Sequence, residues 1–189
     1  MSIQPFDFRR LDVTRFAVET GALEGCAPLG DLPRLAQEAA GPIAADTPIV
    51  IDWQAQGEMR RDAGLGDGVM RPALHLRART RLPLVCQRCL QPAWTEIAVD
   101  RHFLFAPDEA QAVRLDEHAQ DDVLAAAADF DLLALIEDEL LLALPLAPRH
   151  DHCPQALPAQ DGDCVVSGTD QPHPFAALAA LVGPGGQKR

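Results

Sequence analysis

Two long segments that alternate between apolar and polar residues constrain the fold most. Residues 72–86 read PALHLRARTRLPLVC, in which Leu74, Leu76, Ala78, Thr80 and Leu82 point one way and His75, Arg77, Arg79 and Arg81 the other. Residues 94–105 read WTEIAVDRHFLF and place Ile97, Val99, Phe103 and Phe105 on one face. Alternation with a period of two is typical of half-buried strands. The sequence therefore predicts a β-hairpin with Cys86 and Cys89 near its tip.

The same patterns predict further elements on both sides of this hairpin. Residues 48–61 alternate as a strand, and a short strand is expected at residues 15–19. A short helix is expected to begin at an Asp31 cap and to end at Gly41-Pro42. A second helix is expected from Asp129 or Asp131 to Leu144, with an apolar stripe of Leu133, Ile136, Leu140 and Leu144. Such a helix is expected to lie on the sheet.

The remaining segments carry little periodicity. Residues 106–129 are acidic and alanine-rich, which favours an exposed, partly mobile segment. Residues 149–189 predict an irregular tail that ends in a short helix at residues 174–182. We therefore expect one α+β domain at residues 1–148: an antiparallel β-sheet with a helix from the C-terminal half packed on it, followed by a flexible C-terminal tail.

Size and composition favour a cytoplasmic protein. The chain has 189 residues, enough for one domain with a core. No run approaches the roughly 18–20 apolar residues of a membrane helix, and the first residues lack the apolar stretch of a secretory signal. The five cysteines are an odd number, which argues against a disulfide framework. Free thiols or metal ligands are expected instead.

Charge is distributed unevenly along a chain whose formal net charge is −12. Residues 60–101 contain eight arginines and four acids, whereas residues 107–139 contain eleven acids and one arginine. The candidate nucleic-acid-binding residues on the hairpin are Arg77, Arg79, Arg81, Arg88 and Arg101. Arginines spaced along a strand can follow a phosphate backbone. The alternative is a solvated face, or arginines that pair with the acids of this same chain.

The Cys-x-x-Cys turn leaves three interpretations open. It can supply two ligands of a structural zinc, with Cys153 and His150 (or His152) completing the set of Cys86, Cys89, His150 and Cys153. It can instead hold two reduced thiols without metal, or a redox pair. The redox interpretation has the least support, because thioredoxin-like pairs open a helix and strands flank this one. Zinc is the one candidate cofactor.

Two further segments are candidates for binding a partner. Glu137, Asp138 and Glu139 are consecutive on the second helix, so they splay by about 100° each and cannot converge on one ion. They form either a solvated face or a docking surface for a basic protein. Phe175, Leu178 and Leu181 form an apolar stripe that docks either on its own domain or in a groove of a partner.

Three blocks in a fixed order give the chain a resemblance to a known family. They are CQRCLQPAW, then DFDLLALIEDELLLALPLAPRHDHC, then HPFAALAAL near the end. Together they resemble the bacterial YceD proteins, also described as large ribosomal RNA subunit accumulation proteins, over roughly residues 45–182. His173 departs from the asparagine expected before Pro-Phe. The matching residues are Cys86, Arg88 and Cys89; Asp131, Leu132, Glu137, Asp138, Glu139, Leu140, Leu142, Leu144 and Pro145; and Pro174, Phe175, Ala176, Leu178, Ala179 and Leu181.

The resemblance implies a role in the synthesis, processing or stability of large-subunit ribosomal RNA. It supplies no catalytic residue, so a non-enzymatic factor is expected. Its expected partners are ribosomal RNA or a pre-ribosomal particle, a basic protein, or both, and no membrane. Two alternatives stay open: an adaptor that contacts protein only, and an RNA-processing enzyme. An enzyme would need a converging metal or histidine–carboxylate cluster. The sequence does not indicate an oligomeric state.

Overall fold

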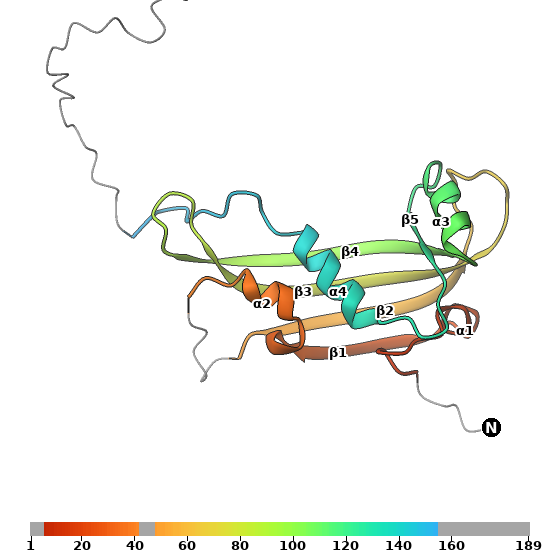
Figure 1. Cartoon of the computed structure of the whole chain (residues 1–189), viewed down its shortest axis with the longest axis horizontal. Helices are drawn as coiled ribbons and strands as arrows, with labels where there is room; N and C mark the ends of the chain where they lie inside the picture. The colour runs from red at the N-terminus through yellow and green to blue at the C-terminus, as the bar shows by residue number, and fades with distance from the viewer. Residues whose placement is uncertain (1–5, 42–47, 155–189) are drawn as a thin grey trace, which may run out of the picture. The chain divides into compact units, whose positions relative to one another are not determined.

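A five-stranded β-sheet forms the centre of the computed structural model, which describes residues 6–41 and 48–154 (Figure 1). The strands lie in sequence order, β1 (Ala22–Pro28), β2 (Val50–Arg60), β3 (Arg71–Val85), β4 (Pro92–Ala106) and β5 (Asp122–Ala125). Strands β1 to β4 pair antiparallel, and β5 pairs parallel to the end of β4. The predicted hairpin of β3 and β4 is confirmed, and so is the strand before it.

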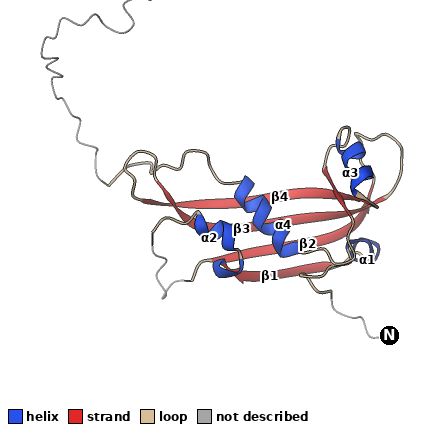
Figure 2. Ribbon diagram, viewed as in Figure 1, coloured by secondary structure: helices blue, strands red, loops and turns tan. Residues whose placement is uncertain are grey.

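Helices lie mainly over one face of this sheet (Figure 2). In chain order they are α1 (Val13–Val18), the 3-10 turn η1 (Leu29–Asp31), α2 (Pro33–Gln37), α3 (Glu109–Asp116) and α4 (Leu132–Leu142). The helices α2 and α4 contact each other, and α4 contacts β3 and β4. The predicted α+β class, with the later helix packed on the sheet, is therefore confirmed.

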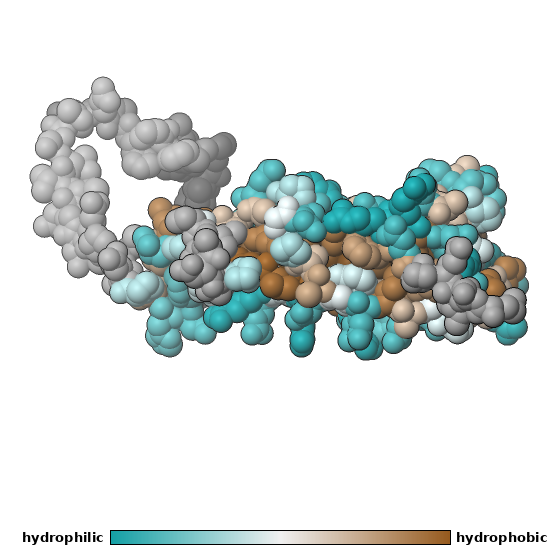
Figure 3. Space-filling model, turned by 90° about the horizontal axis from the view of Figure 1, so that it is seen from below, coloured by the Kyte–Doolittle hydropathy of each residue, from teal (hydrophilic) through white to brown (hydrophobic). Residues whose placement is uncertain are grey.

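The core fills the space between the sheet and α1, α2 and α4. Leu76 and Leu82 of β3 are fully buried there against Ile136 and Leu140 of α4. Because strand side chains alternate, the polar residues of β3 point away from this layer. Figure 3 shows the result in side view, with hydrophilic side chains projecting from the sheet surface opposite the apolar layer.

Helix α4 begins where the sequence predicts. The carboxylate of Asp131 accepts hydrogen bonds from the backbone N–H groups of Leu133 (2.9 Å) and Ala134 (3.1 Å). This is the side-chain cap that the first turn of a helix needs. Within the described ranges 6–41 and 48–154, no helix is both long and apolar enough to cross a membrane.

Three sequence predictions are wrong. Residues 106–129 contain α3 and β5 and are not the irregular segment that was expected. Asp108 caps α3 by accepting from the Gln111 N–H at 2.8 Å. Residues 15–19 fall in α1 and its cap rather than in a strand. Asp31 belongs to η1 and does not cap α2, whose preceding residue is Leu32.

Candidate metal centre

The turn between β3 and β4 is held by its own backbone. The N–H of Cys86 donates to the carbonyl of Gln91 at 3.0 Å, and the N–H of Leu90 donates to the carbonyl of Cys86 at 2.9 Å. Leu90 closes the turn with a φ of 60°, in the left-handed region that few non-glycine residues adopt. This tight turn keeps Cys86 and Cys89 at one end of the sheet.

The segment that follows α4 is fastened to this turn. The N–H of Gln87 donates to the carbonyl of Pro148 at 2.8 Å, and Nε2 of His150 lies 3.0 Å from the carbonyl oxygen of Pro92. Residues 58 and 61 positions apart in the chain therefore meet at the hairpin tip. The contact brings His150 and Cys153 beside the two cysteines of the turn.

Cys86, Cys89, His150 and Cys153 form a compact cluster in which the four ligand atoms all lie within 4.8 Å of one another. The Sγ atoms of Cys86 and Cys153 are 3.9 Å apart, and Sγ of Cys89 is 3.4 Å from Nδ1 of His150. Tetrahedral zinc with bonds of about 2.3 Å to sulfur and 2.0–2.1 Å to nitrogen would require separations of roughly 3.8 and 3.5 Å. Two of the six separations thus match a four-coordinate zinc site, and the others are no longer than 4.8 Å.

His150 is oriented for this role by its second nitrogen. Nε2 faces the Pro92 carbonyl, which can only accept a hydrogen bond, so the proton belongs on Nε2. Nδ1 then presents its lone pair to the sulfur atoms. A ligating histidine is commonly fixed through a carbonyl or carboxylate in this way.

The thiols of the cluster differ in acidity. Burial raises the pKa of Cys86, but hydrogen bonds from the backbone N–H groups of Arg88, Cys89 and His150 outweigh burial. They lower its pKa from 9.0 to about 5. For Cys89, the N–H of Gln91 lowers the pKa, whereas burial and the neighbouring sulfurs of Cys86 and Cys153 raise it above 9.0 overall. The lowered pKa favours the thiolate of Cys86, the form that ligates a metal, and metal binding would release the proton of Cys89.

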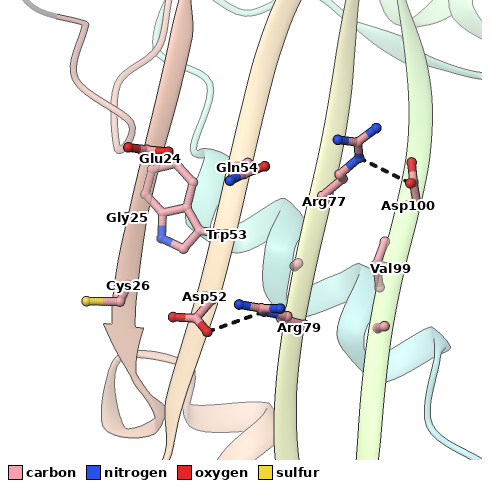
Figure 4. A pocket seen from close by; sticks show the side chains of 12 residues that line it. Glu24, Gly25, Cys26, Asp52, Trp53, Gln54, Arg77, Arg79, Val99 and Asp100 are labelled. Atoms are coloured by element: carbon pink, nitrogen blue, oxygen red, sulfur yellow. Dashed lines mark hydrogen bonds and ion pairs between the residues drawn. The ribbon is translucent and has the colours of Figure 1, made fainter.

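The five candidate arginines do not form one surface. Arg77 and Arg79 lie in an open hollow of about 780 Å³ on the sheet face without α4. Figure 4 shows each of them directed at a carboxylate of a neighbouring strand. Nε of Arg77 is 3.2 Å from Asp100, and Nε of Arg79 is 3.4 Å from Asp52.

Arg101 lies on the opposite face, because its register partner is the buried Leu76. There it pairs with Asp122 of β5, and its Nη1 lies 3.8 Å from Glu139. Arg81 and Arg88 are near the tip, and neither has a carboxylate within 4.0 Å in the described part of the chain. RNA binding by the five stays a prediction.

The three acidic residues of α4 have different surroundings. Glu137 and Glu139 are each 6% exposed, so the prediction of a solvated face is wrong for both. Glu137 accepts from the backbone N–H of Arg34 at 2.7 Å and of Leu35 at 3.2 Å, and therefore caps α2 from another helix. Asp138 is exposed and pairs with Arg34. Their predicted contact with a partner is untested, and Phe175, Leu178 and Leu181 lie outside the described residues.

Sequence reasoning missed two residues at the tip. Trp94 is 51% exposed, although an exposed tryptophan is uncommon, and the guanidinium of Arg81 lies 5.5 Å from its ring centre. Along β4, Trp94 lies on the same face as Glu96 and on the face opposite the buried Ile97. This alternation was the signal in the sequence that Trp94 faces solvent. Arg149 is exposed beside His150.

Comparison with known proteins gives a family. The sequence model of the family described as "Large ribosomal RNA subunit accumulation protein YceD" matches residues 74–182. A curated protein of that same description from Haemophilus influenzae is 35% identical over 103 residues, which are 52% of this chain and 58% of that protein. The chain thus spans little more than half the length of this relative. No solved structure matches. The family match covers most of β3, all of β4 and α4, and all four cluster residues, and the chain belongs to the YceD family.

Proposed function

We propose that this protein is a non-enzymatic factor in the accumulation of large-subunit ribosomal RNA, that it acts by binding, and that a structural zinc orders its hairpin tip. Family membership supports the ribosomal role, since the family description names accumulation of this RNA and no reaction. The observation that carries the mechanism is the four-residue cluster at the tip.

A ligand set of three cysteines and one histidine supports a structural site rather than a catalytic one. Catalytic zinc sites keep one coordination position for water or substrate, whereas structural sites use four protein ligands. All four positions here are accounted for by protein atoms. Zinc, when bound, would neutralise part of the thiolate charge and join the hairpin to the segment after α4.

This arrangement suggests how the metal serves binding. The turn at residues 86–91 and the segment at residues 148–154 come from distant parts of the chain and meet through few hydrogen bonds. A metal that bridges them would hold the side chains of both segments in fixed positions. Pre-ordered binding groups lose less entropy when a partner binds. We therefore assign the zinc a role in presenting the tip.

The metal is tested on the full chain purified without chelator or histidine tag. Elemental analysis is expected to give one equivalent of zinc per chain. Cys86→Ser is expected to lose it, whereas Cys26→Ser is the matched control, because Cys26 is an exposed cysteine on β1 outside the cluster. An absence of zinc from the parent chain would leave two reduced thiols at the turn and remove the metal from the proposal.

The ribosomal role is tested by removing the protein from cells and measuring the ratio of large-subunit to small-subunit ribosomal RNA. The ratio is expected to fall and to recover with the parent gene and with Cys26→Ser. An unchanged ratio would contradict the role. Incubation of the purified protein with precursor RNA, with and without magnesium, is expected to show no cleavage. Cleavage would instead make it a processing enzyme.

A further inference from the structure

The hairpin tip combines an exposed aromatic ring with a cation already stacked on it. Trp94 is 51% exposed, and the guanidinium of Arg81 lies 5.5 Å from its ring centre. Trp94 is on β4 and Arg81 is on β3. In the strand register Arg81 lies opposite Glu96 and Trp94 lies opposite Pro83, so the two side chains are on the same face of the sheet. The arginine limits the rotamers of the indole and leaves much of the ring open to solvent.

Among the described residues, three arginines at this end of the hairpin have no internal ion-pair partner, and one of them, Arg81, lies over the ring. In the ranges that the structure describes, Arg81, Arg88 and Arg149 each have no carboxylate within 4.0 Å. This contrasts with Arg77 and Arg79, which are paired along β3. A zinc centre with three thiolates would add a net charge of −1, and Asp151 adds another. Glu96, the register partner of Arg81 on the same face, adds a third negative charge, so the tip is close to neutral in a chain whose formal charge is −12.

The tip also exposes apolar side chains next to the ring. Leu90 is 70% exposed and Val85 43% exposed, both at or beside the turn. Neither side chain belongs to the buried core of the described domain. With Trp94 and the unpaired guanidiniums they form a small surface of mixed character, the tip patch, made of Arg81, Val85, Arg88, Leu90, Trp94 and Arg149.

We infer that the tip patch binds single-stranded RNA, with one unpaired base stacked on Trp94 and the flanking phosphates bound by Arg88 and Arg149. This inference rests on the proposed function and names the ligand of the tip that the metal centre orders. Aromatic rings and guanidinium planes are the usual platforms for unstacked bases. Guanidiniums without an internal partner in the described part of the chain, together with an exposed ring face, favour an RNA strand over an apolar peptide.

A single strand fits the patch better than a duplex does. Bases in an A-form helix present only their edges in the grooves, so their faces are closed to an indole. The patch offers a ring face and point charges but no array of hydrogen-bond donors for reading base edges. We therefore expect little sequence preference and a strong dependence of affinity on salt.

The test measures fluorescence anisotropy of a labelled single-stranded RNA of about 12 nucleotides, and of the same sequence as a duplex, with the full zinc-loaded chain. The single strand is expected to bind more tightly than the duplex. Trp94→Ala is expected to weaken single-strand binding at least about fivefold, the loss of one stacked base. Trp94→Phe, which keeps an aromatic face, is expected to recover most of the affinity.

Charge is tested separately from stacking. Arg88→Gln and Arg149→Gln are each expected to reduce the slope of log affinity against log salt by about one. Arg114→Gln is the matched control, because Arg114 is exposed on α3 at the other end of the sheet and is expected to change neither quantity. Zinc content and circular dichroism of every variant report whether the fold is intact.

Three results would overturn the inference: no RNA binding by the parent chain, equal affinity for strand and duplex, or no effect of Trp94→Ala. A protein partner that survives nuclease treatment and is lost with Trp94→Ala would also overturn it and would make the patch a protein interface. None of these results bears on the ribosomal role, which is tested separately in cells. If removal of the protein lowers large-subunit RNA while the purified chain ignores RNA, the tip inference fails and the proposed function stands.

Discussion

Glu137 and Glu139 lie two residues apart on α4, are equally buried, and are expected to affect stability in opposite directions. Burial alone raises the pKa of Glu137, but the hydrogen bonds from Arg34 and Leu35 outweigh it and hold the pKa below 4.5. Burial also raises the pKa of Glu139, and Arg101 opposes this only weakly, so the pKa stays above 4.5. The first carboxylate is therefore favoured as an anion in the folded state, and the second is not.

Replacing Glu137 by glutamine is expected to destabilise the protein. The substitution weakens the hydrogen bonds that cap α2 and leaves Arg34 with one carboxylate, at a cost of about 1–2 kcal/mol at pH 7. Because the pKa of Glu137 is lowered in the folded state, its contribution is present above pH 4.5 and is lost as pH falls through the folded value. Urea denaturation measures the change. Asp138→Asn removes an exposed ion pair to the same arginine and is the control, with an expected loss below about 0.5 kcal/mol.

Replacing Glu139 by methionine is expected to stabilise the protein at pH 7 by about 0.5–2 kcal/mol, since a buried carboxylate is exchanged for an apolar side chain of similar length. Because the pKa of Glu139 is raised by folding, its cost is absent below pH 4.5 and appears as pH rises through the folded value. The advantage of the variant should therefore shrink on acidification. Urea midpoints measured from pH 7 downward give this difference, and an advantage that grows at low pH would contradict it.

At the scale of elements, α4 is held by burial rather than by its polar face. Leu140 is fully buried against the sheet, whereas Leu142 is 76% exposed on the same helix. Leu140→Ala is expected to cost about 2–5 kcal/mol through lost contacts and a cavity. Leu142→Ala, with the same chemistry, is expected to change stability by less than about 0.5 kcal/mol. Denaturant midpoints of the two variants decide this, and similar losses would mean that α4 packs differently.

Strong periodicity explains which elements the sequence predicts. Strands β2, β3 and β4 and helix α4 have one buried face over most of their length, so their hydrophobic residues recur with the period of the element. Helix α3 and strand β5 are short and acidic, and β5 gains its place by pairing parallel to β4, which local pattern does not encode. The helix signal at α3 was Asp108 at the cap position, whose carboxylate accepts from both the backbone N–H and the side-chain amide of Gln111. Helix α1 contains Phe16 and Val18, which favour a strand by propensity alone, and is set by its Asp12 cap.

The candidate site, like the fold, was only partly predictable from the sequence. Cysteine and histidine spacing names all four cluster residues, because few residue types can ligate zinc and two short motifs supply them. The arginine surface is less predictable, since partners on adjacent strands, such as Asp52 and Asp100, decide which guanidiniums remain free. The position of Arg101 was readable: it shares the parity of Val99 and Phe103, and that parity places it on the helix-covered face.

For the molecule as a whole, folding brings the acidic and basic segments of the chain together. Arg60 lies 3.4 Å from Asp121, and Arg101 pairs with Asp122, so β5 meets β4 with opposite charge. The uneven distribution along the sequence therefore becomes an internal contact at the end of the sheet where β5 lies. At the opposite end, the tip arginines have no ion-pair partner in the described ranges, whereas Arg77 and Arg79 on the β3 face are paired. For this reason RNA is proposed to bind at the tip and not on the β3 face.

Removing zinc is expected to loosen the tip without unfolding the sheet. The core lies between β2–β4 and α4 and does not include the cluster, apart from the buried Cys86. A chelator should lower the melting temperature by several degrees and increase hydrogen exchange at residues 86–91 and 148–154. Exchange at the centre of β3 should stay slow. Mass spectrometry after exchange measures both, and uniform loss of protection would show that the metal supports the entire fold.

The order of the strands has a kinetic consequence. Each of β1 to β4 pairs with the strand next to it in the chain, so each pairing of the meander closes a shorter loop than the tip does. The tip instead joins Cys86 to Cys153 across a long intervening segment. We expect refolding to build the meander first and to close the tip last, so a newly made chain would meet zinc with its β-sheet already in place.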